Sequence, residues 1–285
     1  MKLVIATAVT LLIAYATFLA YGPRPAHVKI QSQWQKNTFV VEKYFRLVRA
    51  GETSQPKIVL VGSSLAERLD FSRDEPCIYN MALTGESMRT GLNAIVKSGK
   101  IPKQVFIEIN IPDRKNNTVL VEKASGMLPS VSRLFHTENI PMNFLFSSLA
   151  SGKKGSSSSE VSSKVLEIAL ESKRQTYSKA VQPGAIKIAL SEVNELVRTL
   201  ESRGTQVVFF EMPIHPTLEH SVMAQQVRSA FQQTFLQRKI VGYDDLAKGK
   251  ALQTVDGLHL GSDEAAQVSS ILQTYFQPIC TGNPA

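Results

Sequence analysis

The chain has 285 residues, of which 43% are hydrophobic and 20% are charged, and its mean hydropathy is −0.05. This composition is typical of a globular protein and excludes a disordered chain or a protein with many membrane spans. Lysine and arginine outnumber aspartate and glutamate by 32 to 24, which gives a net charge of +8 and a pI of about 9.4. The basic residues are scattered and no nucleic-acid-binding motif is present, so we expect no nucleic-acid partner.

The N-terminal segment carries a targeting signal. Residues 3–21 contain no charged side chain, and their length is close to the roughly 20 residues that cross a bilayer as a helix. The segment therefore predicts a single-pass membrane anchor over residues 1–22, with the domain outside the cytoplasm. A cleaved signal peptide, with Ala14-Tyr15-Ala16 as its small-x-small site, is the alternative and would leave a secreted or periplasmic domain. A buried core helix is a third interpretation.

The region that follows the anchor divides into a linker and a larger domain. Residues 23–55 are expected to form a juxtamembrane linker with a helix at 33–47. Residues 56–280 contain short runs of apolar and β-branched residues that alternate with amphipathic stretches. The runs are at 57–61, 77–81, 104–109, 206–210 and 239–243, and the amphipathic stretches are at 88–96, 186–203, 221–236 and 263–276. This alternation predicts a three-layer α/β/α sandwich with a mainly parallel, flavodoxin-like sheet of five strands. Gly204 is expected to cap the helix at 186–203.

Residues 111–185 interrupt this alternation. They include Gly152-Lys153-Lys154-Gly155 followed by four serines, a composition typical of a flexible, solvated loop. The region is interpreted as an insertion at the carboxyl end of the third strand. It is expected to act either as a lid or substrate platform, or as a surface excursion without function.

Four segments that carry chemistry are expected to lie at one edge of the sheet. Ser64 follows the first strand, Gly85 the second and Asn110 the third, and Asp256-Gly257-Leu258-His259 precedes the last helix. Ligands of open α/β sheets bind beyond the carboxyl ends of the strands. A serine, a histidine that takes its proton and a carboxylate that holds the histidine are the parts of an acyl-transfer triad. Alone, the serine would be read as a helix cap and the Asp-x-x-His as a surface turn; their order and placement favour a catalytic site.

These segments resemble the sequence blocks of the SGNH (GDSL-like) hydrolase superfamily over roughly residues 57–275. The matches in block order are Gly62-Ser63-Ser64 for Gly-Asp-Ser, Gly85 for the second-block glycine, Glu108-Ile109-Asn110 for part of Gly-x-Asn-Asp, and Asp256 with His259 for Asp-x-x-His. The chain looks most like divergent, membrane-anchored members that act as envelope polysaccharide acyl-esterases or O-acyltransferases.

The resemblance implies a role for each matching residue. Ser64 would be the nucleophile, His259 the general base and Asp256 the residue that orients the imidazole. The backbone N–H groups of Ser64 and Gly85 and the side-chain amide of Asn110 would form the oxyanion hole. The substrate would be an ester, either a small one or an acyl group, such as acetyl, on a glycan. Both hydrolysis and transfer to another hydroxyl remain open.

The chain departs from the family pattern at three positions. Ser63 replaces the usual aspartate of the first block, so the choice of nucleophile between Ser63 and Ser64 depends on the alignment. Glu108 replaces the third-block glycine, and Ile111 replaces its aspartate. These departures leave a second hypothesis, a non-catalytic SGNH-like module that binds glycan or a partner in a cell-envelope assembly. A generic doubly wound domain with chance motif matches is a third.

The remaining reactive residues give weaker predictions. His215, which follows the fourth strand, is expected either to contact substrate or to be a structural loop histidine. Cys77 and Cys280 predict either a disulfide in an oxidising compartment or two buried thiols. No metal-ligand spacing and no G-x-G-x-x-G motif are present, so neither a metal nor another cofactor is expected.

Overall fold

The structure is a computed structural model that describes residues 32–71, 77–114, 116–126, 163–236, 240–250 and 252–281, together with Thr10, Asp74 and Arg238. The chain forms two compact units. One consists of residues 37–125 and 159–285 and contains the α/β domain. The other consists of residues 1–36 and 126–158, of which only Thr10, residues 32–36 and Gly126 are described.

Five strands form one sheet in the order β2-β1-β3-β4-β5, and all neighbouring strands are parallel. The strands are β1 (Ile58–Gly62), β2 (Ile78–Ala82), β3 (Gln104–Glu108), β4 (Gln206–Phe210) and β5 (Ile240–Val241). The predicted parallel five-stranded sheet is therefore confirmed, and its order is the flavodoxin-like one. β1 and β2 each extend one residue beyond the predicted end, because Gly62 still pairs with Ala82.

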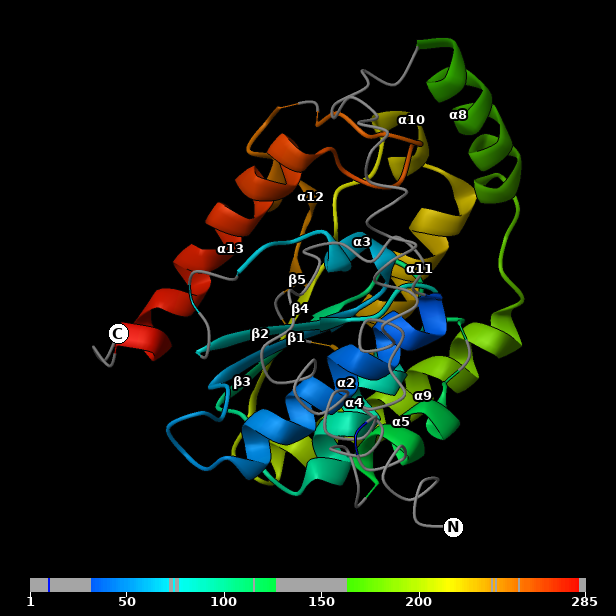
Figure 1. The fold of residues 1–285 in the computed structure, drawn as a ribbon. Coiled ribbons are helices and arrows are strands. Elements are labelled where there is room, and N and C mark those ends of the chain that lie inside the picture. The colour runs from blue at the N-terminus through cyan, green and yellow to red at the C-terminus, as the bar shows by residue number, and fades with distance from the viewer. Residues whose placement is uncertain are drawn as a thin grey trace. The chain divides into compact units, whose positions relative to one another are not determined.

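Helices cover both faces of the sheet and complete the three layers (Figure 1). Those of the larger unit and the helix leading into it are α2 (Gln33–Arg49), α3 (Ser64–Glu67), α4 (Met88–Ser98), α5 (Thr118–Ser125), α8 (Ser163–Tyr177), α9 (Pro183–Glu201), α10 (Pro216–Glu219), α11 (Val222–Thr234), α12 (Tyr243–Ala247) and α13 (Ser262–Thr281). α3, α12 and α13 lie on one side of the sheet, and α2, α4, α5 and α9 lie on the other (Figure 1).

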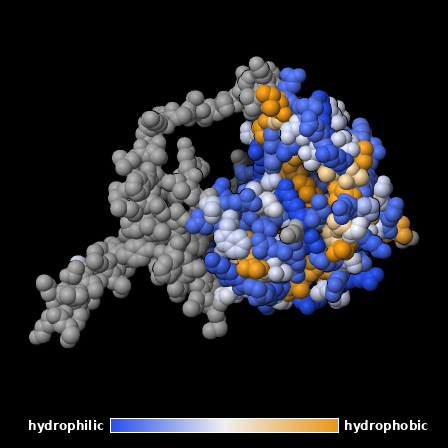
Figure 2. Space-filling model, turned by 90° about the vertical axis from the view of Figure 1, so that its right-hand side faces the viewer, coloured by the Kyte–Doolittle hydropathy of each residue, from blue (hydrophilic) through white to orange (hydrophobic). Residues whose placement is uncertain are grey.

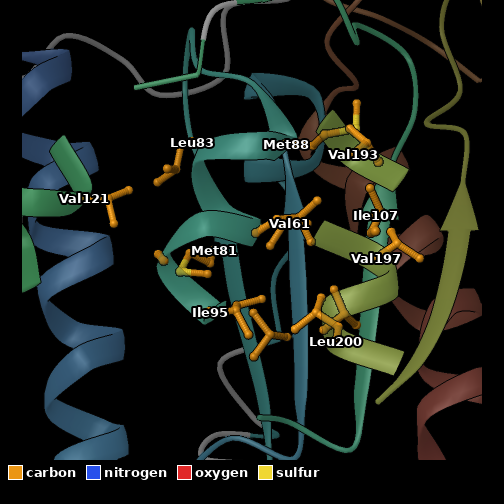
Figure 3. Close-up of a cluster of buried hydrophobic side chains, with 14 of the residues drawn as sticks. Val61, Met81, Leu83, Met88, Ile95, Ile107, Val121, Val193, Val197 and Leu200 are labelled. Carbon is orange, nitrogen blue, oxygen red and sulfur yellow. The ribbon is translucent and has the colours of Figure 1, made fainter. Parts of the chain in front are cut away.

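Each face of the sheet has its own apolar core. Successive side chains of a strand point to opposite faces, so Val59 and Val61 belong to one cluster and Ile58 and Leu60 to the other. Figure 3 shows the first cluster, in which residues of α4 and α9 meet the central strands. All five residues of β1 are buried, which explains why the strand is continuously apolar in sequence.

The helix ends follow from local sequence. Ser87 caps α4 by accepting a hydrogen bond from the N–H of Arg89, and Gly99 ends this helix in the left-handed conformation. The predicted cap of α9 at Gly204 is confirmed. The last helical residue is Glu201, and Gly204 follows in the left-handed conformation with φ +90°. Its N–H donates to the carbonyl of Glu201 at 2.9 Å, and the N–H of Thr205 donates to the carbonyl of Leu200 at 3.1 Å, which is the hydrogen-bond pattern of a glycine-capped helix end.

The helix predicted within the 23–55 linker is present as α2. Its residues Val41, Tyr44, Phe45 and Val48 are buried in the core, so this part of the segment belongs to the folded unit. The predicted anchor at residues 1–22 lies outside the described residues except for Thr10. No helix in the described ranges combines the length and the apolar character that a bilayer crossing requires.

A disulfide links Cys77, just before β2, to Cys280 near the end of α13, with 5.8 Å between the Cα atoms. Of the two alternatives left open by the sequence, the structure contains the disulfide. The bond attaches the last helix to the amino-terminal edge of the sheet, because Cys77 lies at the start of β2 and not at its carboxyl end.

The predicted insertion contains helices at both of its ends. α5 and α8 fall within residues 111–185, and the serine-rich run lies outside the described residues. Hydrophilic residues dominate the face shown in Figure 2, where hydrophobic residues form small groups. The exposed large apolar side chains of the α/β unit are spread over separate elements, for example Val119 on α5, Ile168 on α8 and Ile188 on α9.

Candidate active site

Three side chains from opposite ends of the sequence meet in a hydrogen-bonded row. Ser64 is the first residue of α3, one residue beyond the turn that follows β1. Its Oγ lies 2.9 Å from Nε2 of His259, and Nδ1 of the same ring lies 2.7 Å from Oδ2 of Asp256. Both are normal hydrogen-bond distances. The arrangement connects a hydroxyl, an imidazole and a carboxylate in the order that proton transfer from serine requires.

The two adjacent serines have different positions. The side chain of Ser63 is buried, and its Oγ accepts a hydrogen bond from the N–H of Leu65 at 3.2 Å, which makes Ser63 the N-cap of α3. Ser64 is the serine that contacts His259. The contact with His259 supports Ser64, which holds the third position of the first sequence block, over Ser63 as the candidate nucleophile.

The loop that carries Asp256 and His259 is a compact turn. An antiparallel bridge between Thr254 and Leu260 closes it. Within the turn, Oδ1 of Asp256 accepts hydrogen bonds from the N–H groups of Leu258 and His259 at 3.1 and 2.8 Å. The carboxylate is thus held by the backbone through one oxygen and contacts the imidazole through the other.

These hydrogen bonds determine the charge of Asp256. Burial alone would raise the pKa of the carboxyl, but the ring of His259 and the two backbone N–H groups outweigh burial and hold the pKa below its usual range. Asp256 is therefore ionised at neutral pH. An ionised carboxylate next to Nδ1 favours the tautomer that carries its proton on Nδ1 and leaves Nε2 as the acceptor facing Ser64.

Three contacts attach this turn to the rest of the domain. Nη1 of Arg68, at the end of α3, donates to the carbonyl of Leu260 at 2.9 Å. The N–H of His215 donates to the carbonyl of Gly257, also at 2.9 Å. Gly257 has φ +90°, and a Cβ atom at this position would lie 2.7 Å from Cδ2 of Leu170 on α8. The α8 helix of the insertion therefore covers the turn.

Gly85 and Asn110 lie beside the strand that leads to Ser64. Because β1 is between β2 and β3, the residues that follow these three strands are neighbours at the carboxyl edge. Gly85 has φ +74°, and no hydrogen bond between described residues uses its N–H. The side chain of Asn110 exchanges two hydrogen bonds with the backbone of Met212, at 2.8 and 2.7 Å. One N–H of its amide group is left over for another acceptor.

His215 has a structural contact that competes with the predicted substrate contact. Its Nδ1 accepts a hydrogen bond from the N–H of Thr217 at 3.3 Å and lies 2.9 Å from Oγ1 of the same residue, so His215 caps α10. Burial and the positive charge of Arg174 lower the pKa of His215. The described contacts therefore support the structural interpretation.

Two buried polar residues near the site were not predicted. Glu108, at the end of β3, is 1% exposed, and Tyr177, at the end of α8, is 7% exposed. Burial raises the pKa of Tyr177 to about 12, with a smaller contribution from Glu108, so its hydroxyl stays protonated. Tyr177 and Asn110 line a cavity of about 10 Å³, which is close to the smallest volume that can hold one water. For Glu108 the sequence did contain a signal, a carboxyl that ends an apolar strand.

The described residues contain no group of three or more histidine, cysteine, aspartate or glutamate side chains arranged to hold a metal ion. The side chains of Ser64, His259, Asp256 and Asn110 supply a hydroxyl, an imidazole, a carboxyl and an amide.

The comparisons with known proteins found similar proteins only among solved structures. No protein-family model matches the chain, and no curated protein matches it. A Streptococcus pneumonia protein provisionally described as a platelet activating factor shares 14% identity over 95% of this chain and 99% of its own, with a TM-score of 0.43. TesA shares 12% identity over 78% and 98%, with a TM-score of 0.38. A Bacteroides fragilis protein provisionally described as an acylhydrolase shares 12% identity over 90% and 99%, with a TM-score of 0.41. Values this low assign neither a family nor an activity.

Proposed function

We propose that the protein is an extracytoplasmic serine esterase or O-acyltransferase that acts on ester-linked acyl groups, such as acetyl, of a glycan. The observation that carries this proposal is the row of Ser64, His259 and Asp256, with distances of 2.9 and 2.7 Å. The sequence blocks that resemble SGNH hydrolases supply the same three residues in the same roles.

In the proposed reaction, Oγ of Ser64 attacks the carbonyl carbon of the ester while Nε2 of His259 takes the hydroxyl proton. Asp256 stabilises the imidazolium that forms. When the tetrahedral intermediate collapses, the imidazolium returns the proton to the departing alcohol, and the acyl group stays on Ser64. Water or a sugar hydroxyl then attacks the acyl-enzyme with His259 again as base, which gives hydrolysis or transfer.

The negative oxygen of the tetrahedral intermediate needs hydrogen-bond donors. We assign this role to the backbone N–H groups of Ser64 and Gly85 and to the remaining N–H of the Asn110 amide. Their support is their place at the ends of three adjacent strands. Each such donor is typically worth about 3 kcal/mol of transition-state stabilisation.

The cellular location and the glycan are the finer parts of the proposal. The uncharged residues 3–21 support an anchor or signal segment. The disulfide supports an oxidising compartment outside the cytoplasm, because disulfides persist there. The glycan is supported only by the resemblance to enzymes of envelope polysaccharides.

The test is covalent labelling of the purified full-length chain with a fluorophosphonate, followed by peptide mass spectrometry. We expect the label on Ser64, unchanged labelling of Ser63→Ala, and none in Ser64→Ala or His259→Ala. A folded wild-type chain that takes up no label would contradict the proposal. Turnover of p-nitrophenyl acetate with and without an added acceptor sugar then separates hydrolysis from transfer, since transfer yields an acetylated sugar.

The departures at Ser63 and Glu108 favour one competing function, a module that binds glycan or an envelope partner without catalysis. It makes a different prediction. Ser64→Ala would leave the cellular phenotype intact, whereas the proposed enzyme would lose its function in the same variant.

A further inference from the structure

Glu108 reaches from β3 to the turn that carries the nucleophile. It is the last residue of its strand, and β1 and β3 run in parallel register up to Val61 and Ile107, which places Glu108 beside Gly62. Its Oε2 accepts a hydrogen bond from the backbone N–H of Ser63 at 2.6 Å. This contact joins β3 to the residue that immediately precedes Ser64.

Gly62 leaves the space that this contact needs. A Cβ atom at position 62 would lie 2.6 Å from Oε2 and 2.7 Å from Cβ of Glu108, distances that real Cβ atoms do not reach. The side chain of Glu108 therefore lies over Gly62, where any other residue at position 62 would place its own side chain. The backbone at Gly62 and the side chain of Glu108 are therefore closely packed at this turn.

The carboxyl of Glu108 is costly for the fold. The residue is 1% exposed, and its Oε1 has no hydrogen-bond partner among the described residues. Burial raises the pKa of Glu108, and the hydrogen bonding of Ser63 and the positive charge of Arg114 offset only part of this effect. A buried polar atom without a partner destabilises a protein, so its presence requires another explanation.

We propose that Glu108 is a positioning residue for Ser64: its carboxyl holds the N–H of Ser63 and thereby fixes the turn that directs Oγ of Ser64 toward His259. This inference rests on the proposed nucleophilic role of Ser64. It also connects two departures from the SGNH blocks, because Glu108, which replaces a glycine, accepts from the backbone N–H of Ser63, which replaces an aspartate.

The test compares two substitutions of similar size in the full-length chain. Glu108→Gln keeps an oxygen that can accept from Ser63, whereas Glu108→Met fills the same buried space without an acceptor. The measurements are thermal unfolding, the rate of fluorophosphonate labelling, kcat and KM for p-nitrophenyl acetate, and hydrogen exchange of the Ser63 amide by NMR. Thermal unfolding identifies any variant that fails to fold.

We expect Glu108→Met to lower the labelling rate and kcat roughly tenfold with KM unchanged, and to speed exchange of the Ser63 amide, because one hydrogen bond to a carboxyl is lost. Glu108→Gln should stay within about threefold of the wild type on each measure. A Glu108→Met chain with wild-type labelling and kcat, or a Glu108→Gln chain as impaired as Glu108→Met, would overturn the inference.

Failure of the proposed function gives a different result. The wild type would then take up no label, while exchange of the Ser63 amide would still report on Glu108. Equal Ser63 exchange in Glu108→Met and in the wild type would overturn the positioning role whether or not the chain is an enzyme.

Discussion

The proposed nucleophile, Ser64, and its proposed base, His259, are held in place in different ways. Ser64 follows Ser63, whose backbone N–H donates a hydrogen bond to Glu108 on the neighbouring strand β3. The position of Ser64 therefore depends on the assembled sheet. His259 and Asp256 lie in a short turn whose hydrogen bonds are mostly internal. The proposed base and its carboxylate therefore form a local unit, whereas the position of the proposed nucleophile depends on long-range structure.

The largest expected effect on kcat comes from removing the proposed base, His259. His259→Ala leaves Ser64 without a proton acceptor, so kcat for an ester substrate should fall roughly 10⁴- to 10⁶-fold. Steady-state hydrolysis of p-nitrophenyl acetate would measure this, with Ser64→Ala as the reference for full loss. A loss of less than tenfold would argue against His259 as the base.

Asp256→Asn tests the local unit, and its effect on kcat should be about 10⁴-fold or less, because the histidine loses its preferred tautomer. The folded-state pKa of Asp256 is below its ordinary value of 3.8. Its stabilising effect is therefore present above pH 3.8 and is lost as the pH falls through the folded-state pKa.

The stability difference between the wild type and Asp256→Asn should shrink as the pH falls below 4, where Asp256 begins to take up a proton in the unfolded chain. Urea unfolding at a series of pH values would show this. A difference that grows toward low pH would contradict the direction of the shift.

The disulfide lies at the amino-terminal edge of the sheet, away from both parts of the site, and provides a contrast. Replacing Cys77 and Cys280 together by serine should lower the free energy of unfolding by about 2 to 4 kcal/mol. Labelling of Ser64 below the melting temperature should not change. Calorimetry would measure the loss of stability, and the labelling assay would measure the reactivity of Ser64. Slower labelling of the folded variant would mean that the disulfide at the amino-terminal edge of the sheet affects the site at its carboxyl edge.

Gly257 tests how the turn of His259 fits under α8. Gly257→Ala combines a positive φ with a contact of 2.7 Å to Leu170, so we expect a loss of about 2 to 3 kcal/mol and slower labelling. Gly204→Ala is the matched control, because Gly204 has the same φ of +90° with no neighbouring atom within 4 Å. The control should lose about 1 kcal/mol and label normally. Equal losses in both would mean that α8 exerts no constraint.

The smallest effect is expected at the contact between the two parts. Arg68, on the helix of Ser64, donates to the carbonyl of Leu260, which closes the turn of His259. Arg68→Met should lower kcat only a few-fold and stability by about 0.5 to 1 kcal/mol, because the side chain is exposed. Kinetics with Arg68→Lys as the conservative control would check it, and an unchanged kcat would mean that the two parts align without this bond.

Much of the sheet could be predicted from the sequence, because buried parallel strands are continuously apolar. β4 has the predicted bounds of 206 to 210, whereas β5 keeps only two residues of its predicted run. The short helix α12 was missed because its five residues are too few for a periodic pattern. α8 was missed because residues 111–185 were interpreted only as an insertion, and no helix was predicted after its serine-rich run.

The residues of the candidate site also divide into those with a recognisable local sequence pattern and those without one. Ser64, Asp256 and His259 could be named from their order in the sequence, since each follows a recognisable local pattern. Glu108 and Tyr177 could not be assigned, because what matters in each is burial, which only the assembled layers create. The bond between Asn110 and Met212 likewise joins loops 102 residues apart.

The separation of 203 residues between Cys77 and Cys280 has a consequence for the order of biosynthesis. A ribosome adds Cys280 after both Asp256 and His259, so the disulfide can close only in a chain that already carries every residue of the proposed site. Until then the thiol of Cys77 has no partner in its own chain, because the sequence contains only these two cysteines. A gel-shift assay for oxidised chain would therefore count only molecules whose synthesis has passed the site.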